Sequence, residues 1–404
     1  MKSKIIAAAL FTFTAGGIAF YPALKEVAAV DMPQTDPIQV PAVDAITRQH
    51  PKIEVVFALD TTGSMGGLIQ ASKEKIWSIA STMAQAQPAP EIKMGLVAYR
   101  DRGDNYVTKV VDLSEDLDTV YATLMDFRAE GGGDGPESVN QALHDAVSKI
   151  SWSQDGDAYR VVFLVGDAPP HMDYQDDVKY PQTLKVANAK GIVVNTIQAG
   201  NSAPTRLVWS KIAQGGLGQY AQVSQDGNAV AISTPFDEKL ATLSKKLDET
   251  RLYYGSDEVL EKKRRKLQAA DKLHESASVS SRARRAIFNA SKSGKSNLLG
   301  DSELVDDVAS GRVELDAIKK DHLPSSIRAM APQAQRAMIT EKAKQRKVLQ
   351  EEINELSAQR KEYLKREVKK SGGAKGSLDH KLYSAIREQA GRSGIHYEAE
   401  APAY

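Results

Sequence analysis

Four nearly continuous apolar runs divide the first half of the chain, and they predict buried β-strands. They occupy residues 53–59, 91–99, 160–165 and 191–197. Runs of this kind are typical of strands that are covered on both faces, as in a parallel sheet. Residues 106–113 instead alternate between apolar and polar side chains, which predicts a further strand at the edge of the sheet.

Amphipathic helical patterns lie between these runs. Apolar side chains recur at helical spacing in three groups: Ile69, Ile76, Ile79 and Met83; Leu117, Val120, Tyr121 and Leu124; and Val139, Leu143, Val147 and Ile150. Each group shares one helical face, as expected of a helix that packs on a sheet. Alternating strands and helices predict an α/β fold, with a Rossmann-like, doubly wound and mostly parallel sheet that carries helices on both sides. The pattern ends near Leu247.

The composition changes after about residue 250, where Lys, Arg, Glu, Gln and Ala replace glycine and apolar strands. Leu349, Ile353, Leu356 and Tyr363 follow coiled-coil spacing, with Arg360 at the skipped position. Either a coiled coil that makes a homo-oligomer or a helical hairpin that packs on itself fits this stripe. We therefore divide the chain into residues 1–24, a Pro-containing linker at 25–51, an α/β domain at 52–247, and a charged helical region with a flexible tail at 248–404.

The N-terminus has the pattern of a bacterial-type secretory signal. A short basic segment, residues 1–4, precedes an uncharged apolar stretch at residues 5–20, and Gly17 and Ala19 have the spacing of a cleavage site. We expect an exported protein in the periplasm or cell envelope, with membrane contact only if this segment stays uncleaved. The 404-residue chain has a net charge of +1, which does not favour nucleic acid as a partner, and no cysteine, which excludes thiolate metal sites.

Oxygen-bearing side chains follow two of the predicted strands, and another lies within a glycine-rich loop. Asp60 ends the first strand, and Thr62 and Ser64 follow it before the next helix. Asp167 ends another strand, and Asp134 lies in the segment GGGDGPE. The carboxyl ends of parallel strands share one edge of a sheet, where ligands bind. Carboxylates gathered there repel one another, and a hard divalent cation relieves that repulsion. Helix capping by the hydroxyls is the structural alternative.

At these residues the chain resembles the von Willebrand factor A domain and its metal-ion-dependent adhesion site. The family motif Asp-x-Ser-x-Ser reads Asp60-x-Thr62-x-Ser64 here, and the late strand-end aspartate matches Asp167. The middle loop lacks the usual threonine and is similar to the hemicentin-like variant, which assigns the role to Asp134, with Gly133 as the alternative alignment. The resemblance covers residues 52–247. It implies direct metal contacts from Thr62 and Ser64 and a contact from Asp60 that often runs through water.

The resemblance implies a binding module without catalysis, in which Mg²⁺, or alternatively Mn²⁺ or Ca²⁺, accepts a carboxylate from a partner protein. Two other functions stay open. The segment DTTGS is also similar to the haloacid-dehalogenase superfamily, which would make Asp60 the nucleophile of a Mg²⁺-dependent phosphohydrolase. That superfamily's pump motif has a lysine where Thr61 stands. The helical region also suits a purely structural, oligomeric scaffold.

Overall fold

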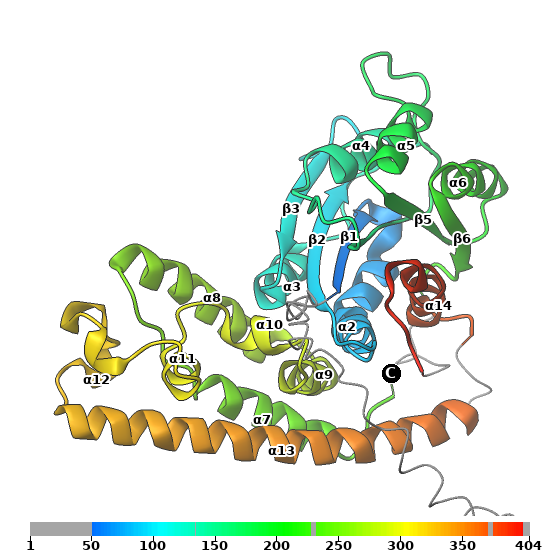
Figure 1. The fold of residues 1–404 in the computed structure, drawn as a ribbon. Helices are drawn as coiled ribbons and strands as arrows, with labels where there is room; N and C mark the ends of the chain where they lie inside the picture. Colours follow the sequence, from blue (N-terminus) through cyan, green and yellow to red (C-terminus); the bar gives the residue numbers. More distant parts are fainter. Residues whose placement is uncertain (1–50, 134, 228–231, 371–374, 399–404) are drawn as a thin grey trace, which may run out of the picture. The chain divides into compact units, whose positions relative to one another are not determined.

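A computed structural model describes residues 51–133, 135–227, 232–370 and 375–398 (Figure 1). Within these residues, six strands form one sheet in the order β3-β2-β1-β4-β5-β6. The strands are β1 (Lys52–Asp60), β2 (Glu91–Tyr99), β3 (Thr108–Ser114), β4 (Tyr159–Gly166), β5 (Ile192–Ala199) and β6 (Leu217–Val223). All neighbouring pairs are parallel except β2 and β3. The mostly parallel sheet confirms the predicted fold class.

The strand order places the sheet's topological switch point beside β1, which pairs with β2 on one side and with β4 on the other. In register, Leu59 pairs with Ala98 and with Val165. Asp60 and the residues that follow β4 therefore leave the sheet at the same edge. This is the edge at which doubly wound sheets bind ligands.

Helices cover both faces of the sheet. One face packs on α4 (Val139–Ser148), α5 (Tyr180–Ala189) and α6 (Ala203–Gly215), and the other packs on α2 (Gly66–Met83) and α3 (Leu117–Asp126). The strand residues alternate between these two cores, since Val55 belongs to one and Val56 to the other. Both are fully buried, and burial on both faces explains why the strands read as continuous apolar runs.

The helix that completes the second face comes from the far end of the chain. It is α14 (Leu378–Ala390), which contacts α2 and β6. Asp379 forms a buried ion pair with Lys75 of α2, with 2.9 Å between the Oδ2 and Nζ atoms. Gln389 exchanges two hydrogen bonds with Asn195 of β5, at 3.0 and 2.8 Å, and accepts one from the Tyr159 hydroxyl at 2.7 Å. The sheet's helical layer is therefore closed by residues about 155 positions beyond the last strand.

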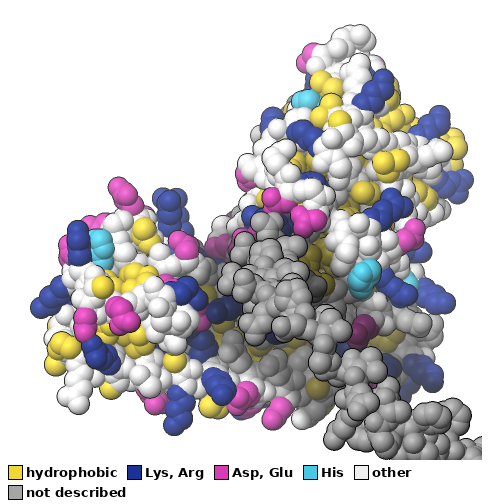
Figure 2. Space-filling view, in the orientation of Figure 1, with side chains coloured by type: hydrophobic (Ala, Val, Ile, Leu, Met, Phe, Trp, Pro, Cys, Tyr) yellow, Lys and Arg dark blue, Asp and Glu magenta, His cyan; other side chains and the backbone are white. Residues whose placement is uncertain are grey.

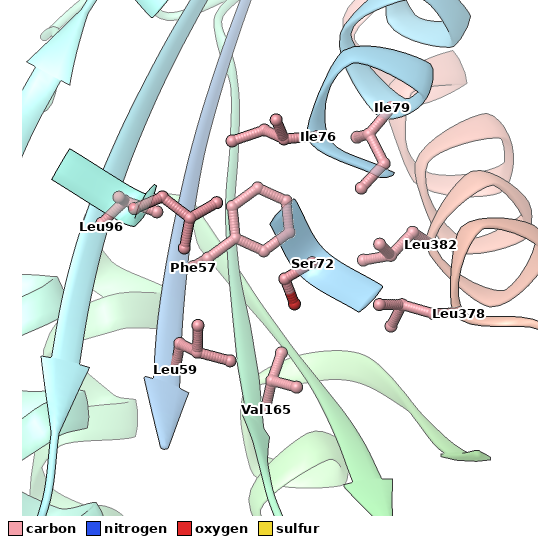
Figure 3. A pocket seen from close by; sticks show the side chains of 10 residues that line it. Phe57, Leu59, Ser72, Ile76, Ile79, Leu96, Val165, Leu378 and Leu382 are labelled. Atoms are coloured by element: carbon pink, nitrogen blue, oxygen red, sulfur yellow. The ribbon is translucent and has the colours of Figure 1, made fainter. Parts of the chain in front are cut away.

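Figure 3 shows how α14 closes over the sheet near β1. A cavity of about 20 Å³ lies between the sheet, α2 and α14. Phe57 and Leu59 point into it from β1, and Leu378 and Leu382 from α14. Such a volume is about that of one water molecule, but the lining is apolar and offers no set of polar partners. The small cavity shows that α14 is packed closely onto the core.

The remaining helices form a charged region between β6 and α14. They are α7 (Asp237–Asp248), α8 (Asp257–Ser276), α9 (Val279–Ala290), α10 (Lys295–Leu299), α11 (Leu304–Ala309), α12 (Ser325–Arg328) and α13 (Pro332–Lys370). A buried ion pair fixes this region to the sheet domain, because Arg285 of α9 donates two 2.6 Å hydrogen bonds to Asp118 of α3. The face in Figure 2 mixes basic and acidic side chains.

The predicted stripe on α13 packs within the chain. Leu349 and Ile353 are buried in one apolar cluster with residues of α7 and α9. Arg360, at the skipped position, is 3% exposed and pairs with Asp237 of α7 at 2.8 Å. Oligomerisation through this stripe would require α13 to lose its contacts with α7 and α9. Homo-oligomerisation through the helical region stays a prediction. Among the described residues, no helix combines the length and apolar character needed to cross a membrane. The expected signal and most of the linker lie outside the described residues.

Candidate metal centre

The loop after β1 positions the first group of predicted ligands. Asp60 is fully buried, and its Oδ1 atom accepts hydrogen bonds from the Thr62 amide at 2.9 Å and from the Thr62 hydroxyl at 2.6 Å. The Thr62 and Ser64 hydroxyl oxygens lie 3.4 Å apart. Thr62 precedes a short 3-10 helix, Gly63–Met65, and Met65 precedes α2, but neither residue caps its helix with a side-chain hydrogen bond. Helix capping therefore does not explain the Thr62 hydroxyl, which is turned back to Asp60.

The second predicted aspartate follows β4 and lies beside the first loop. Asp167 is half-buried, and its Oδ2 atom accepts a 2.6 Å hydrogen bond from the Gln225 amide. Gly166 lets β1 and β4 end close together, because a Cβ atom there would overlap the buried Tyr99 hydroxyl and would lie 3.0 Å from both Cβ and Oδ2 of Asp60. Real Cβ atoms almost never come nearer than this distance. Glycine is therefore needed where the two strand ends meet.

The glycine-rich middle loop is held against the first loop by its backbone. The Gly63 amide donates to the Gly131 carbonyl at 3.1 Å, and the Glu130 amide donates to the Thr61 carbonyl at 3.1 Å. Gly131 and Gly132 both have φ of 77°, in the left-handed region that favours glycine. Asp134, the predicted middle ligand, lies outside the described residues. The loop nevertheless comes to the edge where Asp60 and Asp167 lie, as the sequence predicted.

Glu137 is a carboxylate at this edge that sequence reasoning missed. Its side chain is buried, and among the described residues its Oε2 atom has no hydrogen-bond partner. A Cβ atom on Gly132 would lie 3.3 Å from both Glu137 Oε1 and Thr62 Cβ, so Glu137 approaches the first loop. The signal in the sequence was its place three residues after Asp134, in the turn that starts α4.

A network of polar contacts joins the segments that flank Glu137. Asp101 accepts hydrogen bonds from the Ser138 and Tyr174 hydroxyls, both at 2.9 Å. His171 lies 3.3 Å from Asp101 and 2.9 Å from Asp173, and its ring stacks on Tyr174. The loop that carries Asp167 is thereby fixed to the segments that carry Asp101 and Ser138.

The electrostatics of this edge disfavour a second negative charge. Burial raises the pKa of Asp60 to about 7, and the Asp167 carboxylate raises it further, while hydrogen bonds from Thr62 lower it. Burial also raises the pKa of Glu137 to about 9, with the negative charges of Asp60, Asp101, Asp104 and Asp167 adding to the effect. Buried carboxylates without a cation hold protons in this way, because ionisation would leave unpaired charge in a medium of low polarity.

One observation favours a hard cation at these residues, and a second limits which side chains could hold it. The Asp60 Oδ2 atom is buried and has no hydrogen-bond partner among the described residues. The Thr62 hydroxyl lies 2.6 Å from the other carboxylate oxygen, Oδ1, and 3.4 Å from the Ser64 hydroxyl, so the same loop offers two uncharged oxygen donors. Within the same residues, no three His, Cys, Asp or Glu side chains are grouped so as to hold a metal ion. Any ion here would therefore depend on the Thr62 and Ser64 hydroxyls as well as on carboxylates.

A family model and curated relatives match the part of the chain that forms the sheet. Residues 54–235 match the family model of the von Willebrand factor A domain. The chain is 32% identical over 120 residues to von Willebrand factor A domain-containing protein 7 of Rattus norvegicus, covering 30% of this chain and 12% of that one. It is 27% identical over 120 residues to the alpha-protein kinase vwkA of Dictyostelium discoideum, covering 30% and 19%. The chain spans less than a fifth of the length of these relatives.

Solved structures of such domains are also similar to the chain, although at low scores. The SpRpn10 VWA domain aligns with a TM-score of 0.34 and 12% identity, over 43% of this chain and 89% of that one. The proximal thread matrix protein 1 of the mussel byssus, with a zinc-occupied MIDAS motif, aligns with a TM-score of 0.35 and 16% identity, over 44% and 43%. Together with the matched family model, the sequence relatives support a von Willebrand factor A domain in this chain.

Proposed function

We propose that the von Willebrand factor A domain of this chain is a protein-binding module that depends on a divalent cation. Asp60, Thr62 and Ser64 would hold the ion from the first loop, Asp167 from the loop after β4, and Asp134 from the middle loop. Mg²⁺ suits these hard oxygen donors, as do Mn²⁺ and Ca²⁺. The observation that carries the proposal is the buried Asp60 carboxylate, whose Oδ2 atom has no hydrogen-bond partner among the described residues and whose Oδ1 atom lies 2.6 Å from the Thr62 hydroxyl.

The bound ion would accept a carboxylate from a partner protein. The loops around the site leave room for such an approach, because Ser64 is exposed and Asp167 is half-buried. A Cβ atom added to Gly133 would meet nothing within 4 Å, so open space lies in front of the middle loop. An ion with one position open to solvent attracts an Asp or Glu side chain, and the surrounding loops then set the selectivity.

We further propose that the module acts in the cell envelope after export. The support for this location is the basic and apolar pattern of residues 1–20. Fractionation of the producing cells, together with the mass of the mature N-terminus, tests this part. Export with cleavage near residue 19 is the expected result, and a full-length protein in the cytosol would contradict it.

A pull-down from envelope extract in Mg²⁺ tests the binding function. The tagged full chain should retain specific partners in Mg²⁺ and release them into EDTA, and Asp60→Ala should retain none of them. Lys245→Ala, on the exposed side of α7, serves as a control that leaves the site intact. Partner capture that survives both EDTA and Asp60→Ala would contradict the proposal.

The phosphohydrolase alternative has less support. A nucleophilic carboxylate needs an oxygen that a substrate can reach in line, whereas Asp60 is fully buried and its Oδ1 atom already accepts two hydrogen bonds. We expect no turnover of a generic aryl phosphate in Mg²⁺. Turnover that Asp60→Asn abolishes would establish the enzyme instead.

A further inference from the structure

Gln225 joins the two loops that carry the candidate metal ligands. It lies in the turn after β6, and its Nε2 group donates to Asp167 Oδ2 at 2.6 Å and to the Ser64 carbonyl at 3.1 Å. We propose that Gln225 is a positioning residue, which orients Asp167 and Ser64 for the cation and so sets the affinity of the site. This inference rests on the proposed metal-binding function.

The turn that carries Gln225 is fixed by close backbone contacts. A Cβ atom on Gly67, at the start of α2, would lie 2.9 Å from the Asp226 Cα atom. Gly227 has φ of 75°, and a Cβ atom there would lie 2.7 Å from the side chain of Leu68. The Gly227 carbonyl also accepts a 3.2 Å hydrogen bond from the Leu378 amide of α14. The turn is therefore packed directly on the first turns of α2.

Gly200 makes room for the Gln225 side chain. Gly200, at the end of β5, has φ of 72°, and a Cβ atom there would lie 2.5 Å from Gln225 Oε1. The side chain thus lies between Gly200 and the two loops that carry Ser64 and Asp167. Its oxygen faces the glycine, and its NH₂ group faces Asp167 and Ser64. One amide group serves two acceptors that are 103 positions apart in the sequence (167 − 64).

The physical role follows from the partners of the amide. Carboxylates that bind metals are generally held by outer hydrogen bonds, and removing such a bond typically lowers metal affinity about 10-fold to 100-fold. Here the hydrogen bond restricts the rotation of Asp167 before the ion arrives. The second bond fixes the Ser64 backbone, from which the Ser64 hydroxyl projects. Without Gln225, the Asp167 side chain and the Ser64 backbone would become ordered only when the ion binds. The conformational entropy lost in that step would weaken binding.

Titration of the full chain with Mn²⁺ alone tests this role, with calorimetry for affinity and water-proton relaxation for the number of water molecules on the ion. Gln225→Met keeps the length of the side chain but has no amide. We expect it to bind Mn²⁺ at least 10-fold more weakly and to leave more exchangeable water on the ion. Gln225→Asn retains an amide but is one methylene too short to span both acceptors, and it should also weaken binding.

Gln222→Met is the matched control. Gln222 is also exposed and donates to the Gly200 carbonyl at 2.7 Å, and within the described part of the chain it forms no hydrogen bond to Asp167 or Ser64. It should bind Mn²⁺ like the wild type. Wild-type affinity and hydration in Gln225→Met would overturn the inference while the metal site stands. A wild-type chain that binds no Mn²⁺ would overturn the proposed function and this inference together.

Discussion

Asp60 and Glu137 give the site its chemistry, because both are buried carboxylates with an oxygen that lacks a partner among the described residues. A metal-free protein must either keep these groups protonated or accept unpaired charge in its interior. The divalent cation that we propose would remove this conflict. If it binds here, Asp60 and Glu137 link metal binding to proton binding and to stability, which leads to two predictions at the scale of the residue.

The stability of the metal-free protein should fall as the pH rises from about 4 to about 9. Folding raises the pKa of Asp60 from 3.8 to about 7 and that of Glu137 from 4.5 to about 9. In this range the folded state binds more protons than the unfolded state, so each rise in pH favours unfolding. Urea unfolding in EDTA at a series of pH values measures this effect. Saturating Mg²⁺ should flatten the slope, and a slope that is unchanged by Mg²⁺ would contradict the account.

Glu137→Gln should stabilise the metal-free protein at pH 8 by about 1–3 kcal/mol, because a neutral amide replaces a buried acid and can donate to neighbouring carboxylates. At pH 4 the gain should become small, since the carboxyl group is then largely protonated in the unfolded state as well as in the folded state, and folding requires little proton uptake. Denaturant unfolding of wild type and variant at both pH values provides the measurement. A loss of stability at pH 8 would show that Glu137 is paired in solution.

The sequence predicted these residues unevenly. The sequence places Asp60, Thr62, Ser64 and Asp167 at one edge because each lies at or just after the end of an apolar strand, and strand ends share an edge; their role as ligands stays a prediction. Glu137 and Gln225 have no such marker. Gln225 follows β6, a short and half-exposed strand that sequence reasoning did not predict, so its place at the site depends on packing alone. Asp134 lies outside the described residues, and its role stays a prediction.

At the scale of elements, α14 is the component that the sequence did not reveal. Its apolar face predicts a helix that packs on something, but periodicity cannot tell which surface of the chain it covers. Strands β1, β2, β4 and β5 were predictable because burial on both faces leaves long apolar runs. The position of α14 depends on partners distant in sequence, such as Lys75 and Asn195.

Asp379→Ala should destabilise the protein by about 3–5 kcal/mol, since it removes the carboxylate that pairs with the buried ammonium group of Lys75. Chemical unfolding at pH 7 measures the loss. The double variant Lys75→Met/Asp379→Leu replaces both charges by apolar groups and should recover much of it. Equal loss in the single and double variants would show that the ion pair is not the reason α14 is stably docked.

At the scale of the molecule, the sheet domain is closed only when residues far beyond residue 247 are present. Removing α14 would expose the apolar side chains around Phe57 and Leu59 and leave Tyr159 and Asn195 without Gln389. The helices between β6 and α14 are in turn held to α3 by the pair of Arg285 and Asp118. The sheet domain and the helical region, which the sequence separated at residue 247, therefore pack against each other.

A fragment of residues 50–247 should unfold at a lower denaturant concentration than the chain of residues 50–398, and it should bind the apolar dye ANS. Adding residues 375–398 back through a flexible linker should restore much of the stability, because α14 would regain its contacts with α2 and β6. Circular dichroism and ANS fluorescence of the three proteins provide the measurement. A fragment as stable as the longer chain would contradict this role of α14.

The most direct test of the central claim is a calorimetric titration of the full chain with Mg²⁺ and Mn²⁺, in parallel with Asp60→Ala. The account predicts binding of one ion per chain in the wild type, with proton release near pH 7 from the raised pKa of Asp60, and no binding in the variant. Equal heats from wild type and variant, or no uptake by the wild type, would contradict it.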